Sequence, residues 1–386
     1  MMTENVFEKS LAQYQEFQNK WAESAAKIAE QFDPEKFVEQ LNKTQENMIN
    51  GMKVLIDLKP EDVESDLLEK DVVLEIGKMK LLHYKPTVAA RRQVKIPLMI
   101  TYALVNRQYM MDLQPDRSTI KAFLDAGLDV YMIDWGYPTA EDMYLTLDDV
   151  INWYMDDCVD FIRKETKRDK INLLGVCQGG TFSTMYTAIH QEKVKNLVTL
   201  VVPIDFSVDD AMLFRWSHFM NIDSLVDAYD GVVPGDVMNI AYLILKPLAL
   251  TLDKYVGMTD KWADKDYLTN FIRMEKWTFD SPNQAGRILS DFIHECYQEN
   301  KLVKGTLELG GKRANLKEVT IPVLCACADK DHLVPLSASE PFMDALGSID
   351  KTFLHFPTDH IGMFTSGRSS TEIIPTIITW LKDRYK

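Results

Sequence analysis

The chain has 386 residues, which suffices for two or three domains or for one large α/β domain with insertions. Its 43 Lys and Arg residues stand against 58 Asp and Glu residues, and the net charge of −15 argues against nucleic-acid binding. Hydrophobic residues make up 46% of the chain, as in ordinary globular proteins, so wholesale disorder is excluded.

Cysteine usage and hydropathy predict the compartment. The five cysteines lack the spacing of a disulfide scaffold, and none is spaced with histidine as in a zinc site. The first 31 residues are polar, and no stretch of the chain reaches about 18 uncharged apolar residues. We therefore expect a soluble, cytoplasmic protein with reduced thiols, no signal peptide, no membrane span and no bound metal.

Residues 1–64 are predicted to form a helical extension, because they are rich in Glu, Gln, Lys and Asn and contain a single glycine. Apolar side chains recur there at helical spacing: Phe7, Leu11, Tyr14, Trp21, Ala25, Ile28 and Phe32. Asp33 and Pro34 predict the start of a second helix, whose apolar positions are Phe37, Leu41, Met48 and Met52. The pattern fits docking onto a partner subunit or apolar surface as well as it fits packing onto the chain's own globular domain.

An α/β domain is predicted over residues 65–386. It opens with a β-hairpin, whose two runs Val72–Ile76 and Met79–Tyr84 are joined by Gly77 and Lys78. Further short apolar runs predict strands: Ile96–Leu104, Leu128–Ile133, Ile171–Val176, Leu197–Val202, Val323–Ala328 and Thr352–Phe356. Most of them are separated by helical stretches such as 118–126 and 148–167, so we expect a mostly parallel sheet with helices on both faces.

The alternation of strands and helices is interrupted between Pro203 and Thr320. This interval is rich in Met, Trp, Phe and Tyr and shows no clear strands. We expect a mainly helical cap insertion over about residues 205–315, lying over the sheet.

A candidate nucleophile lies in the segment Gly175-Val-Cys177-Gln-Gly179, between an apolar strand and a helical pattern. The segment is a G-x-S-x-G motif with Cys in the place of Ser, in the strand–turn–helix setting that the motif requires. Small residues two positions before and after the nucleophile prevent clashes in the tight turn, and the helix N-terminus favours a thiolate. We predict that Cys177 is a nucleophile rather than a small buried residue at a turn.

A nucleophile of this type is followed along the chain by an acid and then by a histidine. Two acids come after the strand Val323–Ala328, and we favour Asp331 over Asp329 because Asp331 begins a D-x-x-V-P turn. His360 lies between a short strand and the C-terminal helical pattern, where such a fold places its base. The order Cys177, Asp331, His360 favours a catalytic triad over a turn residue and a surface histidine.

Two backbone N–H groups are predicted to bind an oxyanion at this site. One belongs to Gln178, which directly follows Cys177. The second donor of such sites comes from the loop after an early strand, and we expect the N–H of Val105 in that place.

Four segments together resemble the polyhydroxyalkanoate synthases: Gly175–Gly180, Tyr102–Asn106 with Tyr109–Leu113, Val130–Gly136 and Asp331–Pro335. The resemblance covers roughly residues 65–386 and is greatest with the short catalytic subunits of classes III and IV. The helical residues before it exceed what the shortest members carry. The resemblance implies an α/β-hydrolase-like fold with a helical cap and an N-terminal helical extension.

The same resemblance implies what the protein does. Cys177 would be acylated by (R)-3-hydroxyacyl-CoA, with 3-hydroxybutyryl-CoA as the expected substrate, His360 would be its general base, and Asp331 would help to activate the incoming hydroxyl. The CoA thioester is the substrate, and no cofactor is expected. The implied partners are a growing polyester chain, the surface of a polymer granule, a second copy of the chain in a homodimer and a small helical second subunit.

Two other functions stay open at this point. A cysteine hydrolase, such as a polyester depolymerase, an esterase or a dienelactone-type enzyme, would use the same motif at Cys177. A non-catalytic granule-associated protein would account for the N-terminal apolar stripe without any chemistry.

Overall fold

The protein is described by a computed structural model over residues 34–94, 96–245 and 261–385. Its chain divides into two compact units, residues 1–58 with 252–268 and residues 59–251 with 269–386. Residues 59–64 of the predicted extension lie in the larger unit, where Arg273 donates hydrogen bonds to the carbonyl groups of Asp62 and Glu64. Residues 261–268 of the predicted cap belong to the smaller unit.

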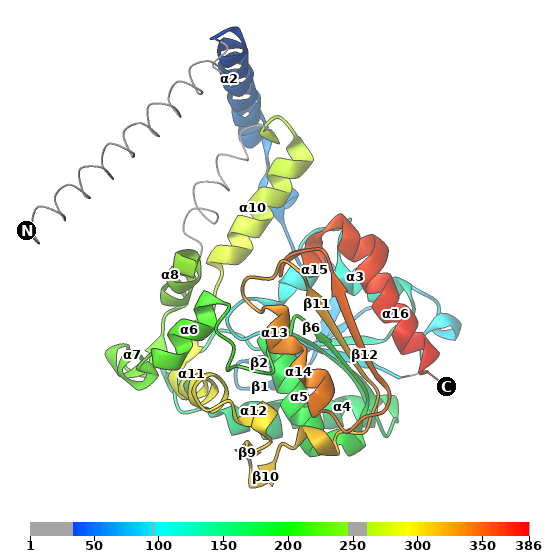
Figure 1. Cartoon of the computed structure of the whole chain (residues 1–386). Helices are drawn as coiled ribbons and strands as arrows, with labels where there is room; N and C mark the ends of the chain where they lie inside the picture. Colours follow the sequence, from blue (N-terminus) through cyan, green and yellow to red (C-terminus); the bar gives the residue numbers. More distant parts are fainter. Residues whose placement is uncertain (1–33, 95, 246–260, 386) are drawn as a thin grey trace, which may run out of the picture. The chain divides into compact units, whose positions relative to one another are not determined.

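Helix α2 (Pro34–Asp57) lies in the smaller unit (Figure 1), and it begins at the residue indicated by the Asp-Pro signal. Gly51 lies against Trp262 in this unit, and a Cβ at position 51 would come 2.5 Å from the Trp262 Cβ. Met48 and Met52 of the predicted stripe are exposed, as are Ile49, Leu55 and Ile56. The apolar positions of the first predicted helix, from Phe7 to Phe32, lie outside the described residues.

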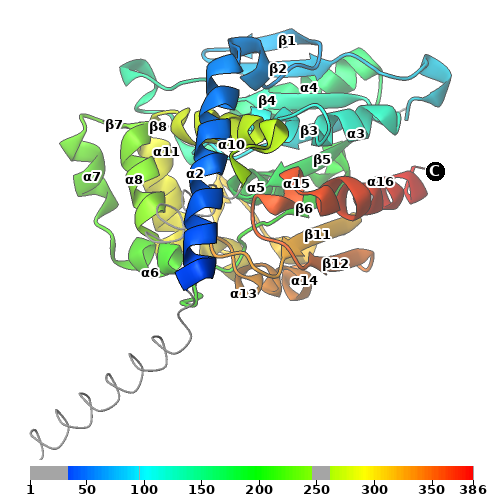
Figure 2. The same ribbon diagram turned by 90° about the horizontal axis from the view of Figure 1, so that it is seen from above.

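An eight-stranded sheet forms the centre of the larger unit (Figures 1 and 2). In spatial order its strands are β1 (Lys70–Ile76), β2 (Met79–Tyr84), β4 (Val130–Asp134), β3 (Leu98–Thr101), β5 (Ile171–Val176), β6 (Val194–Leu200), β11 (Val323–Ala328) and β12 (Lys351–Phe356). β2 is antiparallel to both β1 and β4, and every other neighbouring pair in this sheet is parallel. The predicted hairpin and the mostly parallel sheet are thus confirmed.

Helices cover both faces of this sheet, as Figure 1 shows. One face packs against α4 (Asp156–Thr166), the π-helical turn before it (Asp149–Met155) and α5 (Gln178–His190). The other packs against α3 (Thr119–Asp125), α15 (Gly362–Thr365) and α16 (Ile374–Asp383). Alternate residues of each strand enter the two cores, so a strand buried on both sides reads as a continuous apolar run.

The insertion between β6 and β11 is mainly helical, as expected. Its described helices are α6 (Met212–Phe219), α7 (Ile222–Ala228), α8 (Gly235–Leu245), α10 (Lys265–Phe279), α11 (Gly286–Phe292), the π-helical turn η9 (Ile293–Gln298) and α12 (Lys301–Lys304). The sequence did not reveal two short ribbons, β7 (Val232–Val233) with β8 (Gln284–Ala285) and β9 (Glu308–Leu309) with β10 (Lys312–Arg313), because two-residue strands leave no alternation to detect. In the described parts of the chain, no helix is both long and apolar enough to cross a membrane.

Two glycines separate the effect of positive φ from that of crowding. Gly136, after β4, has φ +73° and a Cβ there would collide with the Lys78 carbonyl, whereas Gly311, in the β9–β10 turn, has φ +72° and open space around it. We expect Gly311→Ala to lower the free energy of unfolding by about 1 kcal/mol and Gly136→Ala to lower it by about 1–3 kcal/mol more. Urea denaturation measures both, and equal losses would contradict the role assigned to the Lys78 contact.

Candidate active site

Cys177 lies in the turn between β5 and α5, with a backbone φ of +54° and ψ of −124°. A residue other than glycine adopts such a positive φ at a cost of about 1–3 kcal/mol. The neighbouring glycines make the turn possible, because a Cβ at Gly179 would collide with the Thr101 carbonyl and one at Gly175 would lie 2.7 Å from Ser183 Oγ. The G-x-C-x-G spacing therefore lets β5, α5 and the end of β3 meet without side chains between them.

The structure brings Cys177, Asp331 and His360 together after the carboxyl ends of β5, β11 and β12. His360 Nδ1 lies 2.6 Å from Asp331 Oδ2, and the same imidazole is hydrogen-bonded to the Cys177 side chain. Because Nδ1 is occupied by Asp331, Nε2 is the nitrogen left for the sulfur. His360 is buried, and the Asp331 side chain has no exposed surface. All three residues predicted as nucleophile, acid and base thus lie in one hydrogen-bonded row.

The protonation of His360 depends on its two neighbours. Burial lowers the pKa of His360, but the Asp331 carboxylate and the Cys177 sulfur together raise this pKa well above its ordinary value. The Asp331 carboxylate is itself held in place, because its Oδ1 accepts hydrogen bonds from the N–H groups of Leu333 and Val334 at 2.9 Å each. The arrangement favours an imidazolium beside the sulfur, which is the setting in which cysteine acts as a nucleophile.

Asp329, the acid not favoured by the sequence, lies in a different pair. Its Oδ1 is 2.6 Å from Nδ1 of His355, whose side chain is 58% exposed. Two acid–histidine pairs therefore follow β11, and the one that reaches Cys177 is Asp331 with His360.

The two predicted oxyanion donors belong to adjoining segments. Gln178 is the first residue of α5, so no preceding helical carbonyl accepts its N–H. Leu104, one residue before Val105, donates its N–H to Gln178 Oε1 at 3.0 Å. This bond holds the Val105 segment beside the residue that follows the nucleophile. The sequence did not indicate it, because a glutamine after a nucleophile carries no distinct signal.

The remaining cysteines differ from Cys177 in burial. Cys158, Cys296, Cys325 and Cys327 are buried, whereas Cys177 is partly accessible. Burial raises the pKa of the Cys158 and Cys296 thiols, which makes them poor nucleophiles. All five thiols are free, and among the described residues no group of three or more His, Cys, Asp or Glu side chains could hold a metal ion.

Three tyrosines near Cys177 were not found by sequence reasoning. Tyr102 lies directly after β3, Tyr242 lies on α8, and Tyr297 lies on η9. Burial raises the pKa of each phenol, and the Cys177 sulfur raises it further. The three O–H groups are therefore neutral. Their positions in distant segments, two of them in the cap insertion, leave no spacing by which a sequence motif could join them to Cys177.

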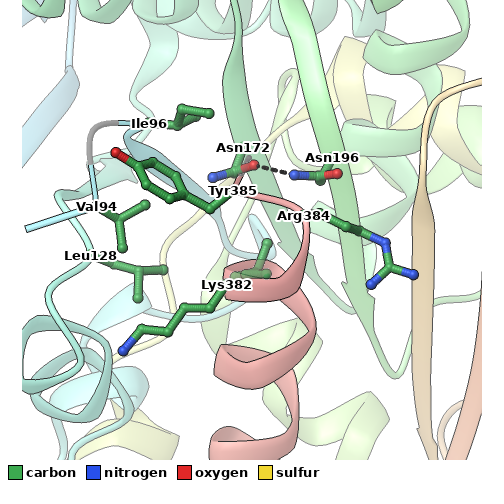
Figure 3. A pocket seen from close by; sticks show the side chains of 9 residues that line it. Val94, Ile96, Leu128, Asn172, Asn196, Lys382, Arg384 and Tyr385 are labelled. Carbon is green, nitrogen blue, oxygen red and sulfur yellow. Dashed lines mark hydrogen bonds between the residues drawn. The ribbon is translucent and has the colours of Figure 1, made fainter.

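A separate pocket lies near the amino ends of the central strands β5 and β6 (Figure 3). Its lining residues are Val94, Ile96, Leu128, Asn172, Asn196, Leu381, Lys382, Arg384 and Tyr385. Asn172 lies near the amino end of β5, and its Oδ1 accepts a hydrogen bond from Asn196 at 2.8 Å. Because Cys177 follows the carboxyl end of the same strand, this pocket and the triad lie at opposite ends of the sheet.

Replacing Asp331 by Asn is expected to lower the pKa of His360, because the carboxylate beside Nδ1 is the strongest influence that raises it. The pKa is read from the pH dependence of the His360 signals in NMR spectra of histidine-labelled protein. Asp329→Asn is the matched control and should leave the pKa of His360 unchanged, since Asp329 pairs with His355. A similar fall in both variants would contradict the pairing described above.

Comparison with known proteins places the chain in a family. Residues 109–366 match the family model of the alpha/beta hydrolase fold, and residues 8–123 match that of the poly-beta-hydroxybutyrate polymerase (PhaC) N-terminus. Two solved structures share the fold at a TM-score of 0.50 each. A thermophilic esterase from Thermogutta terrifontis is 11% identical and covers 82% of this chain and 100% of its own, and a putative non-heme bromoperoxidase from Mycobacterium tuberculosis is 15% identical and covers 82% and 99%.

Curated relatives are much closer in sequence. The poly(3-hydroxyalkanoate) polymerase subunit PhaC of Allochromatium vinosum is 46% identical over 351 residues, which are 91% of this chain and 98% of the relative. The proteins of the same name from Thiocystis violacea and a Synechocystis strain are 44% and 42% identical, over 91% and 88% of this chain and 98% and 91% of their own.

These matches confirm the resemblance and widen its extent. The expectation that it is confined to residues 65–386 is wrong, since the PhaC N-terminal model begins to match at residue 8. The helical residues before the sheet are therefore part of what the relatives share. The chain belongs to the PhaC family of poly(3-hydroxyalkanoate) polymerases, which is built on the α/β hydrolase fold.

Proposed function

We propose that this chain polymerises (R)-3-hydroxyacyl-CoA, with 3-hydroxybutyryl-CoA as the expected substrate, into polyhydroxyalkanoate and releases CoA. The observation that carries the proposal is the hydrogen-bonded row of Cys177, His360 and Asp331 at a positive-φ turn, in a family whose curated members are named polymerases. The CoA thioester is the substrate of the proposed reaction, which uses no separate cofactor.

The first step is transfer of the acyl group to the enzyme. The thiol proton of Cys177 passes to His360 Nε2, and Cys177 Sγ then attacks the thioester carbonyl. The new C–S bond forms first and gives a tetrahedral oxyanion. Collapse of this oxyanion breaks the bond to CoA, and the CoA sulfur leaves with the proton from the imidazolium. The N–H groups of Gln178 and Val105 are the proposed donors to the oxyanion between these two events. The raised pKa of His360 supports its role as the proton carrier.

The second step lengthens the polyester. The hydroxyl group of a 3-hydroxyacyl unit attacks the carbonyl of the acyl-Cys177 thioester and gives its proton to His360. An ester bond forms, the C–S bond breaks, and the sulfur recovers the proton. Asp331 is proposed to assist this hydroxyl through His360, because its side chain is fully buried and its two oxygens are engaged by His360 and by backbone N–H groups.

A cysteine suits acyl transfer better than a serine would. Exchange of one thioester for another occurs at nearly equal bond energy, so the acyl group stays activated for the next attack. The cysteine-hydrolase alternative uses the same three residues with water as the second nucleophile. The match of residues 8–123 to the PhaC N-terminus and the relatives' names favour polymerisation.

The proposed setting is the surface of polymer granules in the cytoplasm. Exposed apolar side chains on α2, Met48 and Met52 among them, support docking of the N-terminal residues onto a partner or an apolar surface. The word "subunit" in the relatives' names supports a second subunit as one partner, which we propose to be small and helical, and a homodimer is the proposed state of the catalytic chain.

Replacing Cys177 by Ala is expected to abolish CoA release from 3-hydroxybutyryl-CoA, because no other described thiol contacts His360. In Cys177→Ser the rate of CoA release should fall at least about 100-fold, since an alkoxide is harder to generate than a thiolate. The matched control is Cys158→Ala, which removes a buried thiol on α4 and should keep the activity. Retention of full activity in Cys177→Ala would refute the proposed nucleophile.

The products distinguish polymerisation from hydrolysis. The proposal expects CoA and precipitating polyester from 3-hydroxybutyryl-CoA, quantified by thiol assay and by gas chromatography after methanolysis. Free 3-hydroxybutyrate in amounts equal to the CoA released would instead identify a hydrolase. Release of neither product would favour a non-catalytic protein.

A further inference from the structure

Glutamine side chains from two parts of the fold bind the N–H and the carbonyl of Leu104, and the carbonyl belongs to the peptide group that Leu104 shares with Val105. The Leu104 N–H donates to Gln178 Oε1 at 3.0 Å, and the Leu104 carbonyl accepts from Gln284 Nε2 at 3.3 Å. Gln178 directly follows the nucleophile, whereas Gln284 lies on β8 in the cap insertion. The two glutamines are 8% and 5% exposed, so water does not compete strongly for their amides.

Gln284 is itself fixed within the cap. Its backbone pairs with Val233 in the β7–β8 ribbon, and its Nε2 also donates to the Pro282 carbonyl at 2.9 Å. The amide that binds Leu104 therefore comes from a side chain whose own position is already determined.

Further hydrogen bonds join the cap to the rest of this loop. The segment 277–284 contacts residues 104–109 through Asn106 Nδ2 to Ser281 Oγ at 3.0 Å, Tyr109 Oη to Asp280 Oδ2 at 2.8 Å and Trp277 Nε1 to the Arg107 carbonyl at 2.7 Å. Together with the Gln284 bond, these contacts follow the loop on both sides of Val105. The cap and the proposed oxyanion loop are thus joined along their length.

The geometry of the peptide bond gives the Gln284 contact its significance. The Leu104 carbonyl and the Val105 N–H belong to one planar trans peptide group, in which the C=O and N–H bonds point in opposite directions. A donor that fixes the direction of the carbonyl therefore also fixes the direction of the N–H. A hydrogen bond accepted by the carbonyl further polarises the group and makes its N–H a stronger donor.

We propose that Gln284 is a positioning residue, which aims the Val105 N–H at the oxyanion by holding the Leu104 carbonyl. The cap segment 277–284 then sets the geometry of acyl transfer through its contacts with residues 104–109. This inference rests on the proposed function, because it concerns the oxyanion formed when Cys177 attacks a thioester.

Gln284→Met tests the inference, because methionine keeps the length of the side chain and removes both amide hydrogen bonds. We expect the first-turnover release of CoA from 3-hydroxybutyryl-CoA to slow by about tenfold or more, less than the loss on deleting an oxyanion donor itself. Alkylation of Cys177 by iodoacetamide, followed by peptide mass spectrometry, should be unchanged. That displacement needs the sulfur and His360 but forms no oxyanion.

Gln298→Met is the matched control, because Gln298 also donates to two backbone carbonyls in the cap, those of Ser217 and Met220, at 3.2 and 2.9 Å. It should change neither rate. Equal slowing of acyl transfer and alkylation in Gln284→Met, or no slowing of either, would overturn the inference, as would equal effects of the two variants. Gln284→Leu replaces Gln284→Met if circular dichroism shows that the latter is unfolded.

The wild-type reaction separates this inference from the proposed function. A wild-type chain that is alkylated at Cys177 but releases no CoA would refute the proposed function and the inference with it. An active wild-type chain and an equally active Gln284→Met variant would refute the inference alone.

Discussion

The approach of Gly179 to the carbonyl of Thr101 is the contact on which the rest of the site depends. It brings the first turn of α5 against the end of β3, and a single methyl group at position 179 would separate the two. The contact gives Cys177 its place at the helix N-terminus and sets Gln178 beside the loop that carries Val105. Nucleophile and proposed oxyanion donors are therefore positioned by one backbone contact between the first turn of α5 and the carboxyl end of β3.

The glycines required by this turn also decide which parts of the site could be predicted from the sequence. Because glycines at 175, 179 and 180 leave a visible pattern, the sequence predicted Cys177 as the nucleophile, and the order of acid and histidine after it along the chain then pointed to Asp331 and His360. The interactions around Leu104 could not be predicted, since Gln178 and Gln284 act through backbone groups that any residue carries. The two-residue strand of Gln284 was also too short to be recognised.

The cap insertion illustrates a second limit of sequence reasoning. Its aromatic and Met-rich composition indicated a helical cover, and that expectation holds for the described helices between β6 and β11. Composition could not show that residues 277–284 are hydrogen-bonded along residues 104–109, because those contacts join side chains to positions about 170 residues earlier. Because residues 277–284 of the cap are hydrogen-bonded to residues 104–109, a displacement of one segment also displaces the other.

The positive φ of Cys177 sets activity and stability in opposition at a single position. Glycine would adopt the same backbone without steric cost, whereas every residue able to act as a nucleophile carries a Cβ and strains the turn. Selection for stability alone would thus replace Cys177 by glycine. The cysteine at this position reflects selection for catalysis. The Cys177→Gly variant would therefore be inactive and yet unfold at a higher temperature than the wild-type enzyme.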